Sequence, residues 1–272
     1  MLKDITLGQY YPSGSVIHKL DPRVKLLGTL LFIISLFAFS GISAYIVASI
    51  FLFAIIQVTR VPLKYMMKGL KAIIVLILIT VVFNLFLTQG EPLVHFWRFT
   101  ITYQGLRISI YMVIRLIYLV LGSSVMTLTT TPTSLTDGLE KGLGFLKRFH
   151  VPVHEVAMMM SIALRFIPIL MDETDKIEKA QMARGATFDS GKLMERIKSF
   201  IPILVPLFVS AFRRANDLAM AMEARGYHGG EGRTKMHPLE YQKRDYIAFI
   251  LLAAYMAAMF CASHFLRINK FF

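Results

Sequence analysis

The sequence has 272 residues, of which 56% are hydrophobic, and it carries a formal net charge of +13. Soluble domains are about 45–50% apolar even when glycine is counted, so this composition excludes an ordinary soluble domain and predicts an integral membrane protein. The basic charge must therefore be placed relative to a membrane before it indicates a partner such as nucleic acid.

The first long apolar stretch predicts two membrane-spanning helices. No residue between Lys25 and Arg60 is charged, which is too long for one span of about 20 residues. Ser40-Gly41 divides the stretch, and Asp21 and Pro22 are expected at the cap and first turn of the first helix. The five predicted spans cover residues 22–39, 42–59, 72–88, 105–130 and 246–266.

A long polar segment separates the fourth and fifth spans. Residues 131–245 hold 17 Lys and Arg and 14 Asp and Glu, whereas the rest of the chain holds 13 basic residues and three acids. We therefore predict an all-α polytopic protein with about five spans. Its parts are an N-terminal membrane region over 1–130, a cytoplasmic or interfacial region of coupling helices over 131–245, and a C-terminal span over 246–272.

The short loop between the second and third spans sets the predicted orientation. It contains Arg60, Lys64, Lys68 and Lys71 and no acid, and at their spacing the four would share one face of a helix. Basic residues in short loops mark the cytoplasmic side, so the N-terminus and the polar segment are also predicted to be cytoplasmic. The C-terminus would then face outward, which departs from this rule because two basic residues lie near it.

Two apolar patches within the polar segment begin an internal repeat. Residues 156–171 and 200–212 are shorter than a comfortable span and suit interfacial or packed helices, although six or seven spans remain an alternative. Phe-Ile-Pro-Ile-Leu occurs in both patches, at 166–170 and 200–204.

An Ala-Arg-Gly triplet follows each Phe-Ile-Pro-Ile-Leu element. The residues are Ala183, Arg184, Gly185, Ala224, Arg225 and Gly226. The arginine lies 16 positions after the proline in the first copy and 23 in the second, a difference close to two helical turns. Arginine followed by glycine is typical of a helix C-terminus, so two long helices with similar ends are predicted. Small residues around a fork-shaped cation also suit docking against a carboxylate.

Few residues indicate catalysis. Arg115 is the one ionisable residue well inside a span, and a structural clamp with Asn84 as partner is the favoured interpretation over a transport pathway. Asp172, Glu173 and Asp175 resemble a metal-binding cluster, but neighbouring lysines favour a solvated helix face. The sequence thus predicts a protein that is not an enzyme and holds no metal.

The whole chain resembles the transmembrane T component of energy-coupling factor (ECF) transporters, the vitamin importers of the ABC class. The resemblance lies in "LGQYYPSGSVIHKLDPRVKLL" near the N-terminus, in the two Ala-Arg-Gly triplets, and in four spans followed by coupling helices and a last span. It implies a multi-pass protein of the bacterial cytoplasmic membrane that binds no cofactor itself.

The resemblance also implies partners. Each triplet would dock in a groove of one of two cytoplasmic ATPases, which would bind ATP and Mg²⁺. The unequal helix lengths expected from the two spacings fit two non-identical ATPases. Apolar helix faces would contact a membrane-embedded, substrate-binding S component, and no nucleic acid is expected. The candidate S-component contacts are Met158, Met159, Met160, Phe166, Ile167, Leu170, Phe200, Ile201 and Leu204.

Two alternatives stay open at this point. The same scaffold serves dedicated cobalt or nickel importers, which this subunit's sequence does not separate from vitamin importers. An integral membrane lipid-modifying enzyme that uses the acids at 172–175 is the rival from another class.

Overall fold

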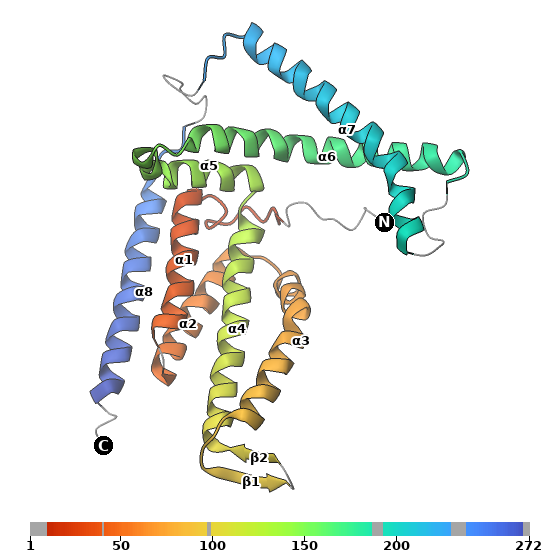
Figure 1. The fold of residues 1–272 in the computed structure, drawn as a ribbon. Coiled ribbons are helices and arrows are strands. Elements are labelled where there is room, and N and C mark those ends of the chain that lie inside the picture. Colours follow the sequence, from red (N-terminus) through yellow and green to blue (C-terminus); the bar gives the residue numbers. More distant parts are fainter. Residues whose placement is uncertain (1–9, 40, 97–98, 187–192, 230–237, 269–272) are drawn as a thin grey trace. The chain divides into compact units, whose positions relative to one another are not determined.

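The computed structural model describes residues 10–39, 41–96, 99–186, 193–229 and 238–268, and these are mainly helical (Figure 1). The helices are α1 (Pro22–Ala38), α2 (Ile42–Thr59), α3 (Leu63–Leu87), α4 (Tyr103–Thr129), α5 (Pro132–Gly142), the short 3₁₀ helix η2 (Gly144–Phe149), α6 (Val153–Ala183), α7 (Leu193–Ala224) and α8 (Lys243–Ile268). The all-α prediction is confirmed, with one addition. β1 (Pro92–Phe96) and β2 (Phe99–Thr102) pair antiparallel between α3 and α4, a hairpin that the sequence did not predict.

The chain divides into two compact units, which we describe separately. The described residues of Gly8–Gly138 and Leu239–Phe272 form one unit, here called the bundle. Those of Leu139–Pro238 form the other, here called the arm, which contains α6 and α7.

Among the described residues, five helices are long and apolar enough to cross a membrane, as predicted, but they are not the predicted five. They are α2, α3, α4, α6 and α8. The first predicted span, α1, has only 17 residues because it ends at Ala38. The apolar patch at 156–171, interpreted as too short, is part of the 31-residue α6, which continues through Pro168. The cytoplasmic or interfacial location of α6 stays a prediction.

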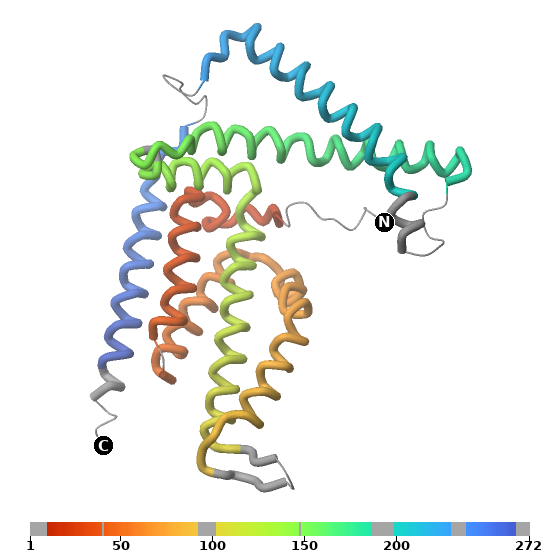
Figure 2. The backbone as a smooth tube through the Cα atoms, in the orientation of Figure 1, coloured from red at the N-terminus to blue at the C-terminus, as the bar shows by residue number. Residues whose placement is uncertain are grey.

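The bundle exposes apolar side chains in the way that a lipid-facing protein does. On α3, the side chains of Val75, Leu78 and Leu87 are 68%, 61% and 70% exposed. α3 and α4 lie side by side along most of their lengths (Figure 2). Such a continuous apolar surface on long helices is stable in lipid rather than in water, and it identifies a multi-pass membrane protein.

The bundle core lies where α1, α2 and α8 meet. The rings of Phe51 and Tyr255 stack with their centroids 4.1 Å apart, and the Tyr255 and Ser35 hydroxyls share a hydrogen bond of 2.7 Å. α4 approaches α1 closely at Gly122, where an added Cβ would lie 2.7 Å from a ring carbon of Phe32. Glycine is required there because of this contact.

The start of α1 is held by a buried polar network. The Asp21 side chain accepts a hydrogen bond from the Arg23 backbone N–H at 2.9 Å, which confirms the predicted cap. Asp245, only 1% exposed, accepts from the Asp21 N–H through Oδ1 and from the Gln242 N–H through Oδ2, both at 2.8 Å. One carboxylate therefore ties the starts of α1 and α8 together.

The predicted basic helix face needs one correction. Lys64, Lys68 and Lys71 lie on α3, but Arg60 does not, because α2 ends at Thr59. Arg60 takes a left-handed conformation with φ of 53°, and Pro62 follows before α3 begins. Proline disfavours a helical conformation in the residue before it, so the two helices cannot join here.

Candidate functional site

In the arm, α6 and α7 pack antiparallel and cross (Figure 1). Glu173 on α6 accepts hydrogen bonds from Ser210 Oγ at 2.6 Å and from Arg214 Nη2 at 2.7 Å, both on α7. Further along α6, Gln181 Nε2 donates to the Pro202 carbonyl at 3.4 Å. Successive residues along α6 therefore contact α7 in reverse order, as antiparallel packing requires.

α6 ends in a glycine cap formed by the first triplet. Ala183 is the last helical residue, Arg184 is the C-cap, and Gly185 takes φ of +89°. The N–H of Gly185 donates to the Met182 carbonyl and that of Ala186 to the Gln181 carbonyl, both at 3.0 Å. These two bonds define a Schellman motif, in which the left-handed residue is nearly always glycine.

α7 ends in the same way. It stops at Ala224, and Gly226 takes φ of +73°. The Gly226 N–H donates to the Glu223 carbonyl at 2.9 Å and the Tyr227 N–H to the Met222 carbonyl at 3.0 Å. The repeated triplet is therefore a repeated cap, as the sequence predicted.

The two caps present their residues to the surroundings. All six triplet residues are exposed, and nothing lies within 4 Å of a Cβ added at Gly185 or Gly226. Within the described part of the chain, neither Arg184 nor Arg225 has an acidic partner. Each cap therefore offers an exposed cation at a helix end, with no obstructing neighbour among the described residues.

The two caps lie at different distances from their prolines, although α6 with 31 residues and α7 with 32 are nearly equal in length. Both stretches are helical, so the 16 and 23 positions between proline and arginine correspond to about 24 and 35 Å. The prolines themselves do not face each other, because Pro202 lies against the end of α6, near Gln181. The expected difference in helix length is therefore wrong, and the arm carries two similar ends on helices of nearly equal length.

The candidate S-component contacts fall into two groups. Phe166 and Leu170 line a groove of about 270 Å³ between α6 and α7, opposite Ala211, Leu218 and other α7 residues. Exposed members are Met159, Met160, Phe200, Ile201 and Leu204, whereas Met158 and Ile167 are half-buried. The structure therefore does not bring all nine onto one surface.

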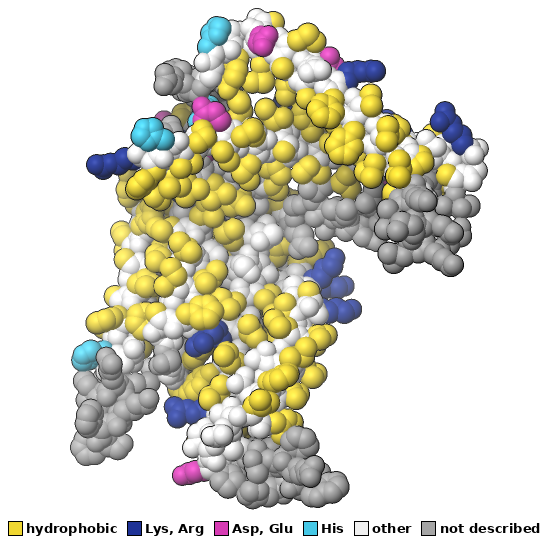
Figure 3. Space-filling view, in the orientation of Figure 1, with side chains coloured by type: hydrophobic (Ala, Val, Ile, Leu, Met, Phe, Trp, Pro, Cys, Tyr) yellow, Lys and Arg dark blue, Asp and Glu magenta, His cyan; other side chains and the backbone are white. Residues whose placement is uncertain are grey.

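Sequence reasoning missed most of an apolar stripe on α7. The stripe comprises Phe200, Ile201, Leu204, Val205, Phe208, Val209 and Phe212, which are 42–68% exposed. Their spacing of alternate one and three residues places them along one side of a helix. The same periodicity can be read in the apolar patch at 200–212, but the prolines at 202 and 206 made a continuous helical face difficult to recognise. Hydrophobic side chains dominate the α7 surface visible in Figure 3.

Comparisons with known proteins decide the family. A family model described as cobalt transport protein, CbiQ, matches residues 13–236. The chain is 54% identical over 250 residues to the energy-coupling factor transporter transmembrane protein EcfT of Clostridium kluyveri, an alignment that covers 91% of this chain and 93% of that protein. It is 46% identical over 261 residues to the EcfT protein of Bacillus subtilis, covering 96% and 98%. The chain belongs to the CbiQ/EcfT family.

Membership of the CbiQ/EcfT family fixes the broad role. The EcfT protein of Thermosediminibacter oceani is 51% identical over 249 residues and carries the same description as a transporter transmembrane protein. This chain is accordingly the transmembrane component of an energy-coupling factor transporter, as the resemblance in its sequence implied. The bundle supplies the membrane helices that such a component needs.

One of the acids behind the rival enzyme interpretation, Glu173, has a structural role in this CbiQ/EcfT protein. Glu173 is engaged by Ser210 and Arg214 and joins α6 to α7. In the described part of the chain, no three His, Cys, Asp or Glu side chains are grouped so that they could hold a metal ion.

Arg115 has a different partner from the one expected. Its Nε donates to the Tyr45 hydroxyl at 3.1 Å, and its guanidinium lies 5.3 Å from the centre of the Phe37 ring. Asn84 instead donates to the Thr80 carbonyl of its own helix at 2.8 Å. Arg115 therefore links α4 to α2 and α1, and the predicted pairing with Asn84 is replaced by a tyrosine that sequence spacing could not identify.

Proposed function

We propose that this chain couples two cytoplasmic ABC ATPases to a membrane-embedded S component, and that the complex imports a vitamin or similar micronutrient. Ala183-Arg184-Gly185 would dock on one ATPase and Ala224-Arg225-Gly226 on the other. The observation that carries this proposal is the pair of identical Schellman caps with exposed, unpaired arginines. Arginine binds carboxylates through two parallel hydrogen bonds, so a groove with an acidic residue is the expected receptor.

The mechanism follows from the shape of the arm. ATP and Mg²⁺ would bind to the ATPases, and closure of the ATPases would displace the two helix ends. Since the helices cross, movement at the caps changes the crossing angle, and the apolar α7 stripe moves with it. That stripe, together with Met159 and Met160, is the proposed S-component surface.

The proposed orientation places the N-terminus and the arm in the cytoplasm. Lys64, Lys68 and Lys71 at the start of α3 support this orientation through the positive-inside rule. Accessibility of a single cysteine introduced at Arg184 to a membrane-impermeant thiol reagent, compared in intact cells and inverted vesicles, tests it.

Charge reversal at the caps tests ATPase docking. Arg184→Glu and Arg225→Glu should each reduce co-purification of the ATPases with the tagged chain, whereas the S component should still co-purify. Arg213→Glu is the matched control, because Arg213 is also an exposed arginine of α7 but lies away from the cap. Normal ATPase recovery with both cap variants, or equal loss with Arg213→Glu, would reject the docking proposal.

A second set of variants tests the S-component surface. Met159→Gln should reduce S-component recovery and leave ATPase recovery unchanged. Met67→Gln is the control, because Met67 is 53% exposed on α3, close to the 56% of Met159. Equal loss of both partners would contradict the assignment.

The substrate class needs an uptake measurement. The family model is named for cobalt transport, whereas the relatives at about half identity are named as energy-coupling factor proteins. Cells that express the complex should accumulate a radiolabelled vitamin in an ATP-dependent manner. Accumulation of cobalt or nickel alone would instead assign the chain to a metal importer.

A further inference from the structure

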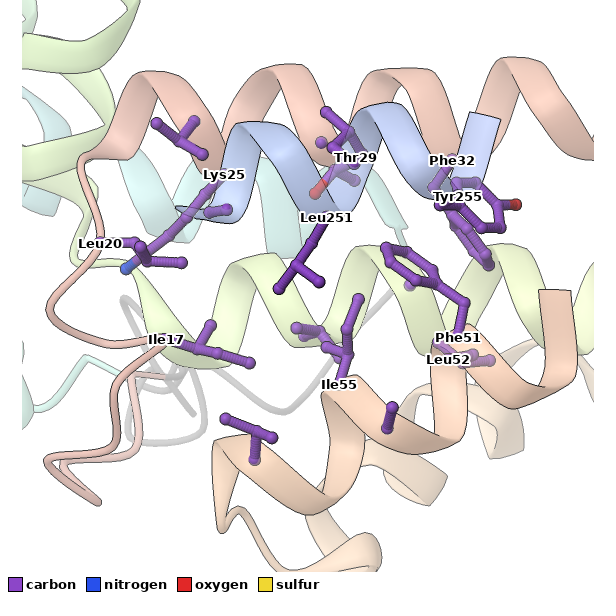
Figure 4. A pocket seen from close by; sticks show the side chains of 18 of the residues that line it. Ile17, Leu20, Lys25, Thr29, Phe32, Phe51, Leu52, Ile55, Leu251 and Tyr255 are labelled. Atoms are coloured by element: carbon purple, nitrogen blue, oxygen red, sulfur yellow. The ribbon is translucent and has the colours of Figure 1, made fainter. Parts of the chain in front are cut away.

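The bundle contains an apolar groove between α1, α2, α4 and α8 (Figure 4). Its volume is about 590 Å³, within the range of small-molecule binding sites. Phe32, Phe51 and Tyr255 mark one end and Ile17, Leu20 and Lys25 the other. The proposed coupling function makes no use of this groove.

The groove opens toward the surroundings of the bundle. Three of its lining residues, Ile50, Ile247 and Leu251, remain 65%, 58% and 60% exposed. These side chains belong to helices that qualify as membrane spans. Lipid is therefore the medium that has access to the groove.

The length of the groove matches one leaflet. Along α8 it runs from Arg244 to Ala258 and along α1 from Val24 to Phe32, which correspond to about 21 and 12 Å. Half of a hydrocarbon core of about 30 Å is about 15 Å. The groove thus starts where α1 and α8 begin and where α2 and α4 end, and it stops near mid-membrane.

The charged residues of the groove lie at the end where α1 and α8 begin. Its lining includes the cations Lys25 and Arg244 and no acid. The Lys25 Nζ donates to the carbonyls of His18 and Thr129, at 3.0 and 2.8 Å. The Arg244 Nε is buried and has no hydrogen-bond partner among the described residues. A buried guanidinium N–H without an acceptor is unfavourable, so an acceptor beyond the described residues is expected, and a ligand in the groove can supply it.

We propose that the groove binds one acyl chain of an anionic phospholipid, whose phosphate accepts a hydrogen bond from Arg244. Charge complementarity supports this occupant, because the apolar groove ends at Lys25 and Arg244, and the Arg244 Nε has no partner among the described residues. In the proposed orientation, the leaflet is the cytoplasmic one, which carries the anionic lipids.

Quenching by brominated lipid tests the site in the full-length protein. Trp97, the single tryptophan, is replaced by phenylalanine, and a tryptophan reporter is introduced through Leu251→Trp in the groove. Ile250→Trp is the matched reporter, because Ile250 is the adjacent residue and is 67% exposed but does not line the groove. The detergent-solubilised proteins are titrated with phosphatidylglycerol or phosphatidylcholine that carries dibrominated acyl chains.

The Leu251→Trp protein should bind phosphatidylglycerol about fivefold more tightly than phosphatidylcholine, the ratio that one basic residue near the lipid surface provides. The Ile250→Trp protein should show no such preference. Added to the groove reporter, Arg244→Gln should remove the preference and Lys243→Gln, which changes a neighbouring cation outside the groove, should keep it. Ala248→Phe should fill the groove and reduce quenching by both lipids, whereas Ala253→Phe, outside the groove on the same helix, should not.

Any one of four results would overturn the proposal. Equal affinity of the groove reporter for both lipids, or a preference that survives Arg244→Gln, would remove the headgroup site. The same preference at Ile250→Trp would indicate general attraction of anionic lipid to a basic protein. Shielding of the groove reporter from both lipids that is relieved by deletion of residues 1–9 would assign the groove to the chain's own N-terminal segment.

Discussion

Replacing Gly226 with alanine tests whether the shape of the α7 cap matters for ATPase docking. Gly226 has φ of +73°, and nothing lies within 4 Å of its added Cβ. The whole effect of Gly226→Ala therefore comes from backbone strain, about 1–2 kcal/mol for a residue with a side chain in the left-handed conformation. If the strained cap opens, the bonds from Gly226 to Glu223 and from Tyr227 to Met222 are lost.

The strain sets the largest effect on docking. If docking requires the closed cap, the docking free energy can become less favourable by no more than the strain energy. This limit corresponds to about a 5- to 30-fold loss of affinity. The assay is a titration of the purified ATPase pair onto the labelled chain in detergent micelles. Circular dichroism should show little loss of helix, because only the end of α7 is affected.

Two variants serve as controls for Gly226→Ala. Gly226→Asn should weaken docking less, because asparagine tolerates the left-handed conformation better than alanine does. Gly142→Ala, at the end of α5, should leave docking unchanged, because Gly142 lacks a positive φ and an added Cβ meets nothing within 4 Å. Wild-type affinity for Gly226→Ala, or a larger loss with asparagine than with alanine, would refute the reasoning.

Two further predictions concern the bundle. Gly122→Ala should lower the free energy of unfolding by about 1–3 kcal/mol, because the new methyl group overlaps the Phe32 ring. Gly28→Ala should not lower it, because the nearest neighbour of the added Cβ is 3.9 Å away. Thermal unfolding in detergent compares the two variants. Asp245→Asn should lower the unfolding temperature through a loss of about 1–3 kcal/mol, because an amide cannot accept from both the Asp21 and Gln242 N–H groups; unchanged stability would contradict the role given to this carboxylate.

Local signals in the sequence predicted local structure well. Asp21 caps α1, and Gly185 and Gly226 close α6 and α7, because each of these features depends on a few neighbouring residues. The extent of the helices was harder to predict, since the apolar patches at 156–171 and 200–212 were interpreted as short, whereas α6 and α7 continue through Pro168 and Pro206. A proline within a helix removes one hydrogen bond, and packing between long helices offsets that loss.

Contacts between distant residues could not be predicted from one sequence. Asp245 bonds to the N–H of Asp21, 224 positions away, and nothing in its own surroundings distinguishes it from a solvated acid. Arg115 was recognised as exceptional because it lies within an apolar span, but its partner Tyr45 depends on how α2 packs against α4. The sequence thus identified Arg115 as a group that needs a partner. Only the packing of the helices shows the partners of Arg115 and Asp245.

The most direct test of the coupling role is ATP-driven uptake in proteoliposomes that contain the chain, two ATPases and an S component. The wild-type complex should accumulate radiolabelled vitamin when ATP is enclosed with the ATPases. The complex with both Arg184→Glu and Arg225→Glu should accumulate none, although the chain and the S component remain in the membrane. Uptake at the wild-type rate by this double variant would contradict the proposal that the two Ala-Arg-Gly caps transmit the motion.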